Sequence, residues 1–106
     1  MITLKDLQLE VGIWSRRNFP NNLPHHPLLG VSEEVGELCH AHLKQEQGIR
    51  GTFGEHQAAK EDAVGDILIY LADYCERNNI VLEDAVETAW NQVKERDWQK
   101  NKQQGK

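Results

Sequence analysis

The sequence predicts an all-α domain with a four-helix bundle-like fold. Apolar residues recur at spacings of three and four in four separate stretches, and no stretch alternates apolar and polar residues as a strand would. A chain of 106 residues has room for one domain. We therefore expect a single domain over residues 1–106, with a C-terminal tail that frays from about residue 99.

The first helix is expected over residues 4–17. Thr3 followed by Asp6 resembles a capping box. The apolar stripe of this helix is Leu4, Leu7, Val11 and Trp14. The run NFPNNLPHHP holds all three prolines and ends the helix, so we expect either an ordered loop or a mobile flap there.

A second helix is predicted to begin near Pro27 or Leu28 and to end at about residue 48, where the glycines of GIRGTFG favour a loop. Its expected buried stripe is Leu28, Val31, Val35, Leu38 and His42. The expected stripe follows the helical period, so these residues would share one face.

The third helix is predicted from near Glu55 to about Arg77. It is apolar nearly all round from Val64 to Leu71, which predicts the central helix of a bundle. The fourth helix is predicted to run from Leu82 to about Trp98. Its stripe is Leu82, Val86, Ala89, Trp90 and Val93.

The composition excludes several classes of protein. The net charge is −5 and the acidic residues are spread along the chain, which gives no electrostatic footprint for duplex nucleic acid. The longest apolar run, residues 67–72, is far too short to span a membrane. Cys39 and Cys75 lie in apolar helical patterns and are expected to be reduced thiols. We expect a soluble cytoplasmic protein.

Carboxylates stand where a small helical protein would be expected to bury leucines. Glu34 and Glu37 are three residues apart, and Asp62 and Asp66 are four apart, so each pair shares a helix face. If the faces meet, each carboxylate pair at about 4 Å would repel by about 4 kcal/mol at an effective dielectric of about 20. A divalent cation would remove this repulsion, and carboxylate oxygens favour Mg²⁺, with Mn²⁺ as the other candidate.

Asp66 lies in the most hydrophobic stretch of the chain, where an ionised carboxylate needs a partner. It could instead be a capping residue or pair with a base. However, the only basic residues of its predicted helix are Lys60 and Arg77, and neither is close to Asp66 in sequence. A metal or catalytic role is therefore favoured.

Gly36 and Gly65 lie mid-helix, and each precedes an acid of this set. A mid-helix glycine costs about 1 kcal/mol relative to alanine. Both glycines predict a close approach of the second and third helices at this level. Tight packing without a metal would also explain the glycines, but it would leave the acids unexplained.

The run SEEVGELCHAHLK followed by EDAVGDILIYLADYC resembles the EExxE and downstream acidic signature of the MazG-like nucleotide pyrophosphohydrolases, in the all-α NTP pyrophosphatase superfamily. The resemblance extends over most of the chain. The family usually has a glutamate three residues before the aspartate. Here that position is Ala63 and the acid is Asp62, which leaves the number of bound ions open.

The resemblance implies hydrolysis of a nucleoside triphosphate between its α and β phosphates, giving a monophosphate and pyrophosphate. The implied metal ligands are Glu34, Glu37, Asp62 and Asp66. Glu33 or Glu37 would take the proton of the attacking water. A house-cleaning role against aberrant nucleotides and regulation of a normal pool both stay open, as do the base and the sugar.

Several basic and aromatic residues are candidate substrate contacts. The basic candidates are Lys44, Arg50, Lys94 and Arg96, each of which could also be a plain surface charge; Arg50 stands out because it lies in the glycine loop. Asn91, with Lys94 and Arg96, is similar to the C-terminal pattern of the family.

Phe19, in the proline loop, is the aromatic candidate for stacking on a base, with His25 and His26 at the base edge. Trp14 and Trp90 fit helical stripes and are expected in the core.

Three other functional classes match parts of the sequence. Glu37 and His40 form an ExxH pair, but a di-iron carboxylate site needs a second pair, and positions 65 and 69 are Gly65 and Ile69. A phosphoribosyl-ATP-type pyrophosphohydrolase, which is related by fold, stays open. A non-enzymatic helical interaction module would leave the acid at position 66 without a purpose.

Self-association is expected. A chain this short buries only roughly 60–70% of the surface of its unfolded form. Trp90 and Trp98 lie on different faces of the predicted fourth helix. We expect a homodimer or a homotetramer, the alternative being a compact monomer whose proline loop covers the exposed stripe.

Overall fold

The computed structural model describes residues 1–103, and within them it has four α-helices and no strand. The helices are α1 (Leu4–Asn18), α2 (His26–Gln47), α3 (Phe53–Arg77) and α4 (Leu82–Val93). The all-α prediction is confirmed. Of the tail that was expected to fray, residues 99–103 are turns and irregular structure, and residues 104–106 lie outside the described residues.

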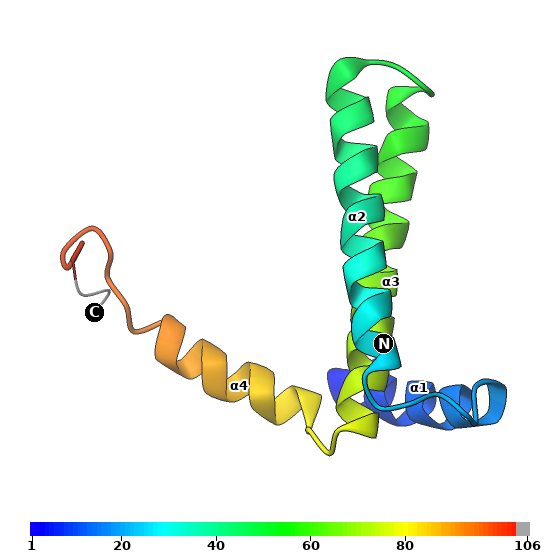
Figure 1. Cartoon of the computed structure of the whole chain (residues 1–106). Helices are drawn as coiled ribbons and strands as arrows, with labels where there is room; N and C mark the ends of the chain where they lie inside the picture. Colours follow the sequence, from blue (N-terminus) through cyan, green and yellow to red (C-terminus); the bar gives the residue numbers. More distant parts are fainter. Residues whose placement is uncertain (104–106) are drawn as a thin grey trace.

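Helices α2 and α3 form a long antiparallel hairpin that rises from the rest of the molecule (Figure 1). Gly48 ends α2 in the left-handed conformation, with φ 67°, which glycine adopts without a steric penalty. Thr52 caps α3, because its hydroxyl accepts from the Glu55 backbone N–H at 3.1 Å while the Glu55 carboxylate accepts from the Thr52 N–H at 3.1 Å. The short connection 48–52 thus sets the register of the hairpin.

Helix α1 crosses the foot of the hairpin, and the main core lies there (Figure 1). The core cluster is Val11, Ala72, Cys75 and Leu82, with Leu4, Leu7, Leu71 and Tyr74 packed against it. Gln8 joins α1 to the start of α4, since its amide donates to the Ile80 carbonyl at 2.6 Å and accepts from the Leu82 N–H at 2.8 Å. The capping box of Thr3 and Asp6 is present as predicted.

Helix α4 extends away from the other three helices (Figure 1). Only Leu82 of this helix is buried, while Val86, Trp90 and Val93 are exposed. Within residues 1–103 the structure is therefore a small bundle of α1, α2 and α3 with a projecting fourth helix, whose apolar stripe beyond Leu82 is exposed. The helix also ends at Val93 rather than near Trp98. Beyond it, the Asp97 carboxylate accepts from the Lys100 N–H and closes a turn.

The buried stripes of α2 and α3 are narrower than the sequence predicts. In α2, Pro27 and Ala41 are buried and Val31 and Leu38 are half-buried, whereas Leu28, Val35 and His42 are exposed. In α3, Val64 and Ile69 are also exposed. The reason is that α3 is the main helix that covers α2, and a pair of helices buries only the seam between them.

The remaining composition-based expectations concern thiols and membranes. Cys39 and Cys75 are both free thiols, as predicted; Cys75 is buried in the core and Cys39 is exposed. In the described part of the chain, no helix is long and apolar enough to cross a membrane.

Candidate functional site

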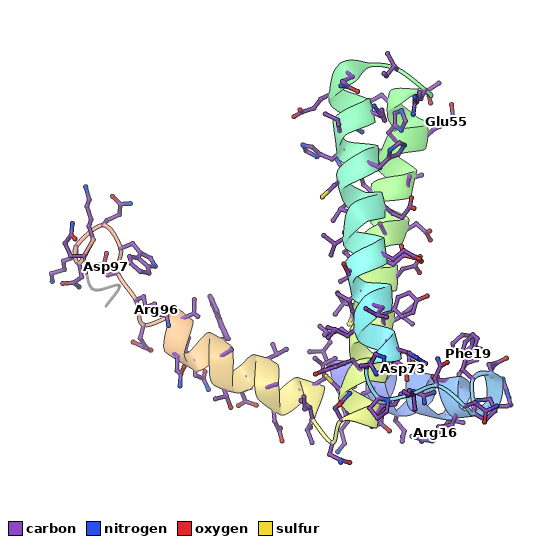
Figure 2. The ribbon with its side chains drawn as sticks, viewed as in Figure 1. Arg16, Phe19, Glu55, Asp73, Arg96 and Asp97 are labelled. Atoms are coloured by element: carbon purple, nitrogen blue, oxygen red, sulfur yellow. The ribbon has the colours of Figure 1, made fainter. Side chains whose placement is uncertain are left out.

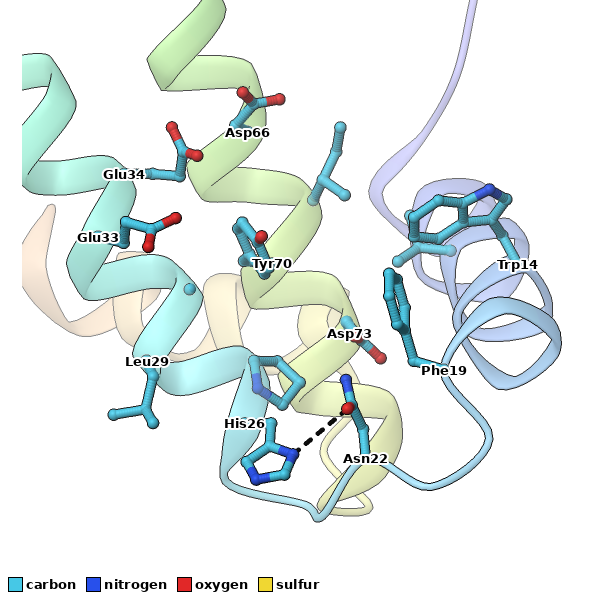
Figure 3. Close-up of a pocket in the computed structure, with 14 residues that line it drawn as sticks. Trp14, Phe19, Asn22, His26, Leu29, Glu33, Glu34, Asp66, Tyr70 and Asp73 are labelled. Atoms are coloured by element: carbon cyan, nitrogen blue, oxygen red, sulfur yellow. Dashed lines mark hydrogen bonds between the residues drawn. The ribbon is translucent and has the colours of Figure 1, made fainter.

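A cavity of about 570 Å³, which we call the aromatic pocket, lies where α1, the proline loop, α2 and α3 meet (Figure 3). Its walls are apolar and aromatic at one end and acidic at the other. Its lining includes Trp14, Phe19, Asn22, His26, Tyr70 and Asp73. Cavities of this size and character commonly bind small molecules.

A second cavity of about 370 Å³, the acidic hollow, lies higher between α2 and α3. It is lined by all five predicted acids, Glu33, Glu34, Glu37, Asp62 and Asp66, together with His40 and His56. Glu33, Glu34 and Asp66 line both cavities, so these three acids stand where the aromatic pocket and the acidic hollow adjoin (Figure 3). The helical spacing thus brings the two acidic faces together.

The carboxylates of the hollow act on one another electrostatically. The pKa of Glu34 is raised above its ordinary value, first by desolvation and then by the negative charge of Asp66, followed by Glu33, Glu37 and Asp62. Glu34 therefore holds a proton more readily than an isolated glutamate. A cation placed in the hollow would counter this repulsion.

The hollow fits a divalent cation in its donor chemistry. Carboxylate oxygens are the ligands that Mg²⁺ prefers, and Glu33, Glu37 and Asp62 are exposed enough to change rotamer. As the side chains stand, however, no three His, Cys, Asp or Glu residues within 1–103 are arranged to hold a metal ion. Ligation would require the glutamates to turn inward.

Gly36 and Gly65 do not mark the close approach of α2 and α3. Among the described residues, no atom beyond their own helices' neighbouring backbone lies within 4 Å of a Cβ built on either glycine. Both glycines are exposed, so the expected explanation is wrong for both. The tight contact is at Gly30 instead, where an added Cβ would overlap the ring of Tyr70.

Tyr70 is a pocket residue that sequence reasoning missed. Its ring lines the aromatic pocket, and its pKa is raised by desolvation first and then by Glu33, Glu34, Asp66 and Asp73. The phenol is therefore held in its neutral, proton-donating form. The signal was available, because Tyr70 follows Asp66 by four residues and so shares its helix face.

Phe19, the aromatic candidate of the proline loop, lines the aromatic pocket (Figure 3). Its ring stands edge-to-face with Trp14, with the centroids 5.7 Å apart and the planes at 71°. Trp14 was expected in the core, yet it is 47% exposed and lines the same pocket, because α1 covers only the foot of α3. Trp90, also expected in the core, is 58% exposed on α4.

The two histidines of the proline loop differ. His26 lines the pocket, its Nδ1 accepts from the Leu23 N–H at 3.0 Å, and the same nitrogen lies 3.3 Å from Oδ1 of Asn22 (Figure 3). His25 is exposed and its ring stands against that of His26. Of the pair, His26 is placed to meet a ligand.

The predicted basic contacts lie away from the acids. Lys44 donates to Gln47 near the end of α2, and Arg50 is exposed in the connection with φ 61°. Asn91 and Lys94 belong to the end of α4, and Arg96 follows it, far from the hairpin (Figure 2). These five residues are absent from the lining of both cavities. Within the part of the chain that the structure describes, they therefore do not reach the acidic hollow.

Asp73 and Asn22 are further pocket residues that the sequence did not reveal. Asp73 is buried, and its carboxylate accepts from Ser15 Oγ at 2.8 Å and from Arg77 Nε at 3.0 Å. Arg77, considered above as a partner for Asp66, is thus the partner of Asp73. The four-residue spacing of Asp73 and Arg77 was the available signal.

Comparison of the chain with protein-family models, curated proteins and solved structures finds no significant match. The resemblance to the MazG-like family stays a prediction.

Proposed function

We propose that this protein is a Mg²⁺-dependent nucleoside triphosphate pyrophosphohydrolase that cleaves between the α and β phosphates, as the resemblance to the MazG-like family implies. The observation that carries the proposal is the adjacency of the two cavities. An aromatic pocket of about 570 Å³ and a hollow lined by five carboxylates share Glu33, Glu34 and Asp66. A nucleotide has the same two-part character, with a flat apolar base and a charged chain of phosphates.

The aromatic pocket would hold the base. Phe19 and Trp14 offer ring faces and edges for stacking. Asn22 and His26 offer polar groups for the base edge. Tyr70, held as the neutral phenol, could donate a hydrogen bond toward the sugar or the first phosphate.

The acidic hollow would hold the phosphates. Glu34, Glu37, Asp62 and Asp66 are the residues that would bind Mg²⁺, or Mn²⁺ in its place. When bound, the cation would supply positive charge that neutralises the phosphates. Without it, an anionic substrate would be repelled by a chain whose net charge is already −5.

The carboxylates also provide the base for hydrolysis. Glu33 or Glu37 would accept the proton of the attacking water, whose oxygen bonds to phosphorus as the α–β anhydride bond breaks and pyrophosphate leaves. Both side chains line the acidic hollow and are exposed, so water reaches them. A positioned general base of this kind contributes about 10²–10⁴-fold in rate.

The test is a pyrophosphate-release assay over a panel of NTPs and dNTPs with Mg²⁺, Mn²⁺ or EDTA. We expect release with either metal and none with EDTA. Glu37→Gln and Asp66→Asn should each lower the rate by at least about 100-fold while circular dichroism shows an intact fold. The matched control is Glu61→Gln, which removes one charge from α3 outside both cavities.

Other products would identify other functions. Hydrolysis restricted to phosphoribosyl-ATP would assign the related activity. Oxygen consumption with iron would support a di-iron protein. The absence of both hydrolysis and oxygen consumption would support a helical interaction module. Full activity in Glu37→Gln or Asp66→Asn would contradict the proposed mechanism.

A further inference from the structure

A closed hydrogen-bonded triangle joins α1 to the end of α3. Ser15 Oγ donates to Asp73 Oδ2 at 2.8 Å, Arg77 Nε donates to Asp73 Oδ1 at 3.0 Å, and an Arg77 terminal nitrogen donates to Ser15 Oγ at 2.8 Å. The Arg77 and Asp73 side chains are only 11% and 10% exposed, and Ser15 is fully buried. At this burial the guanidinium is fixed in one orientation.

The same guanidinium also binds the part of the proline loop that precedes α2, residues 19–25. It donates to the Asn22 carbonyl at 2.9 Å and to the Phe19 carbonyl at 3.1 Å. Next to it, the Asn78 amide donates to the Pro24 carbonyl at 2.9 Å. Pro20 and Pro24 have no N–H, so the loop makes few backbone hydrogen bonds of its own and depends on these donors from the end of α3.

Two residues of the bound loop, Phe19 and Asn22, line the aromatic pocket, whereas Arg77 does not (Figure 3). We propose that Arg77 is a positioning residue that fixes the proline loop, and so sets the affinity of the pocket for a nucleotide base through Phe19 and Asn22. The proposal rests on the proposed function, because it takes the base to bind in this pocket. Arg77 contacts neither the base nor the reacting phosphates.

Only a guanidinium at position 77 can hold the proline loop in this way. Its four hydrogen bonds to the triangle and the loop use three nitrogens spread in a plane. A lysine keeps the charge opposite Asp73 but concentrates its donors on one nitrogen, so it cannot reach Asp73, Ser15 and both loop carbonyls together. Arg77→Lys therefore releases the loop while it leaves the buried Asp73 carboxylate compensated.

The matched control is Arg16→Gln. Arg16 also joins α1 to α3, through Glu76 at 3.3 Å, but this pair is more exposed and its residues lie outside the pocket. Asn78→Ala serves as a second variant, since it removes the Pro24 contact without altering a buried charge.

Two measurements separate positioning from general stability. Amide hydrogen exchange of the free protein should be at least about tenfold faster at the Asn22 and His26 amides in Arg77→Lys, with a smaller increase in Asn78→Ala and none in Arg16→Gln. With the NTP that is turned over fastest, KM should rise about tenfold in Arg77→Lys while kcat changes less than about threefold.

Wild-type exchange in Arg77→Lys would overturn the proposal, and so would faster exchange with an unchanged KM. A fall in kcat with unchanged KM would also overturn it, because it would place Arg77 in the chemistry. A wild-type protein that hydrolyses no NTP contradicts the proposed function and with it the link to affinity; the exchange measurement then still decides whether Arg77 holds the loop.

Discussion

The ring of Tyr70 lies directly against the Cα of Gly30, where α2 and α3 pass each other beside the aromatic pocket. A side chain on Gly30 would occupy the space that the ring fills. The absence of a side chain at Gly30 therefore lets the Tyr70 ring form the wall of the pocket, which offsets the low helix propensity of glycine.

Gly30→Ala should destabilise the protein although alanine is the better helix former. Overpacking typically costs about 1–3 kcal/mol, against a propensity gain of about 1 kcal/mol. Gly36→Ala is the matched control on the same helix, because the described residues leave open space around a Cβ there, and it should be neutral or stabilising by up to about 1 kcal/mol. Urea unfolding measures both. Equal stability of the two variants would show that the Tyr70 ring yields without cost.

The raised pKa of Glu34 predicts that the contribution of this residue to the free energy of unfolding falls as pH rises. Since its folded pKa lies above the ordinary 4.5, the folded state binds a proton more tightly than the unfolded state between the two values. The stabilising contribution of Glu34 is fully present below pH 4.5 and is lost as pH rises through the folded pKa of its carboxyl group. Glu34→Gln should flatten this decline in urea unfolding from pH 4 to 8.

Glu55 supplies the control with the opposite sign. Its pKa is lowered, chiefly by the hydrogen bonds with Thr52, so its stabilising effect is present above pH 4.5 and is lost as pH falls through the lowered value. Glu55→Gln should thus flatten the acid side of the profile. If Glu34→Gln leaves the slope above pH 4.5 unchanged, the acids of the hollow do not interact as described.

Magnesium should raise the melting temperature of the wild-type protein. A ligand that binds only the folded state adds about 2.7 kcal/mol at a hundred times its Kd. Asp66→Asn should melt higher than wild type in EDTA, because it relieves repulsion, and should gain less from Mg²⁺. Calorimetry gives the affinities, with Glu61→Gln as the control. Unchanged Mg²⁺ affinity in Asp66→Asn would place the ion elsewhere.

The protein should be an oligomer in solution. It exposes 7940 Å², against about 6,100 Å² for a compact monomer of its mass. Its radius of gyration is 17.1 Å, against about 13 Å for a compact domain of this length. The excess area exceeds the roughly 800 Å² that each partner buries in a standard interface, and exposed Val86, Trp90 and Val93 on α4 contribute to it.

Light scattering at micromolar concentration should therefore give at least twice 12.2 kDa. Trp90→Gln should lower the mass, whereas Asp84→Asn, on the opposite side of α4, should not. A wild-type mass near 12.2 kDa would establish the monomer.

The parts of the structure that the sequence predicted are those that depend on near neighbours. The cap of Thr3 and Asp6 is one example, and the gathering of Glu34 with Asp66 follows from spacings within two adjacent helices. Periodicity shows which residues share a face, but it does not show what covers that face. For that reason Trp14 was expected in the core, although it lines a pocket.

The missed contacts join residues far apart in the chain. Ser15 and Asp73 are separated by 58 positions, and nothing local to either residue indicates the other. Gly30 shows no sequence feature that separates it from Gly36, since only the arrival of Tyr70 distinguishes them. Such pairings depend on how α1 and α2 dock on α3.

The short connection 48–52 also has a kinetic consequence. Loops of about this length close in tens of nanoseconds, and we expect the hairpin of α2 and α3 to form before α1 docks from a distant part of the sequence. The charge repulsion of the hollow would then act in the folding transition state as well as in the folded protein. Divalent cations or added salt should accordingly speed refolding, and Asp66→Asn should do the same in their absence.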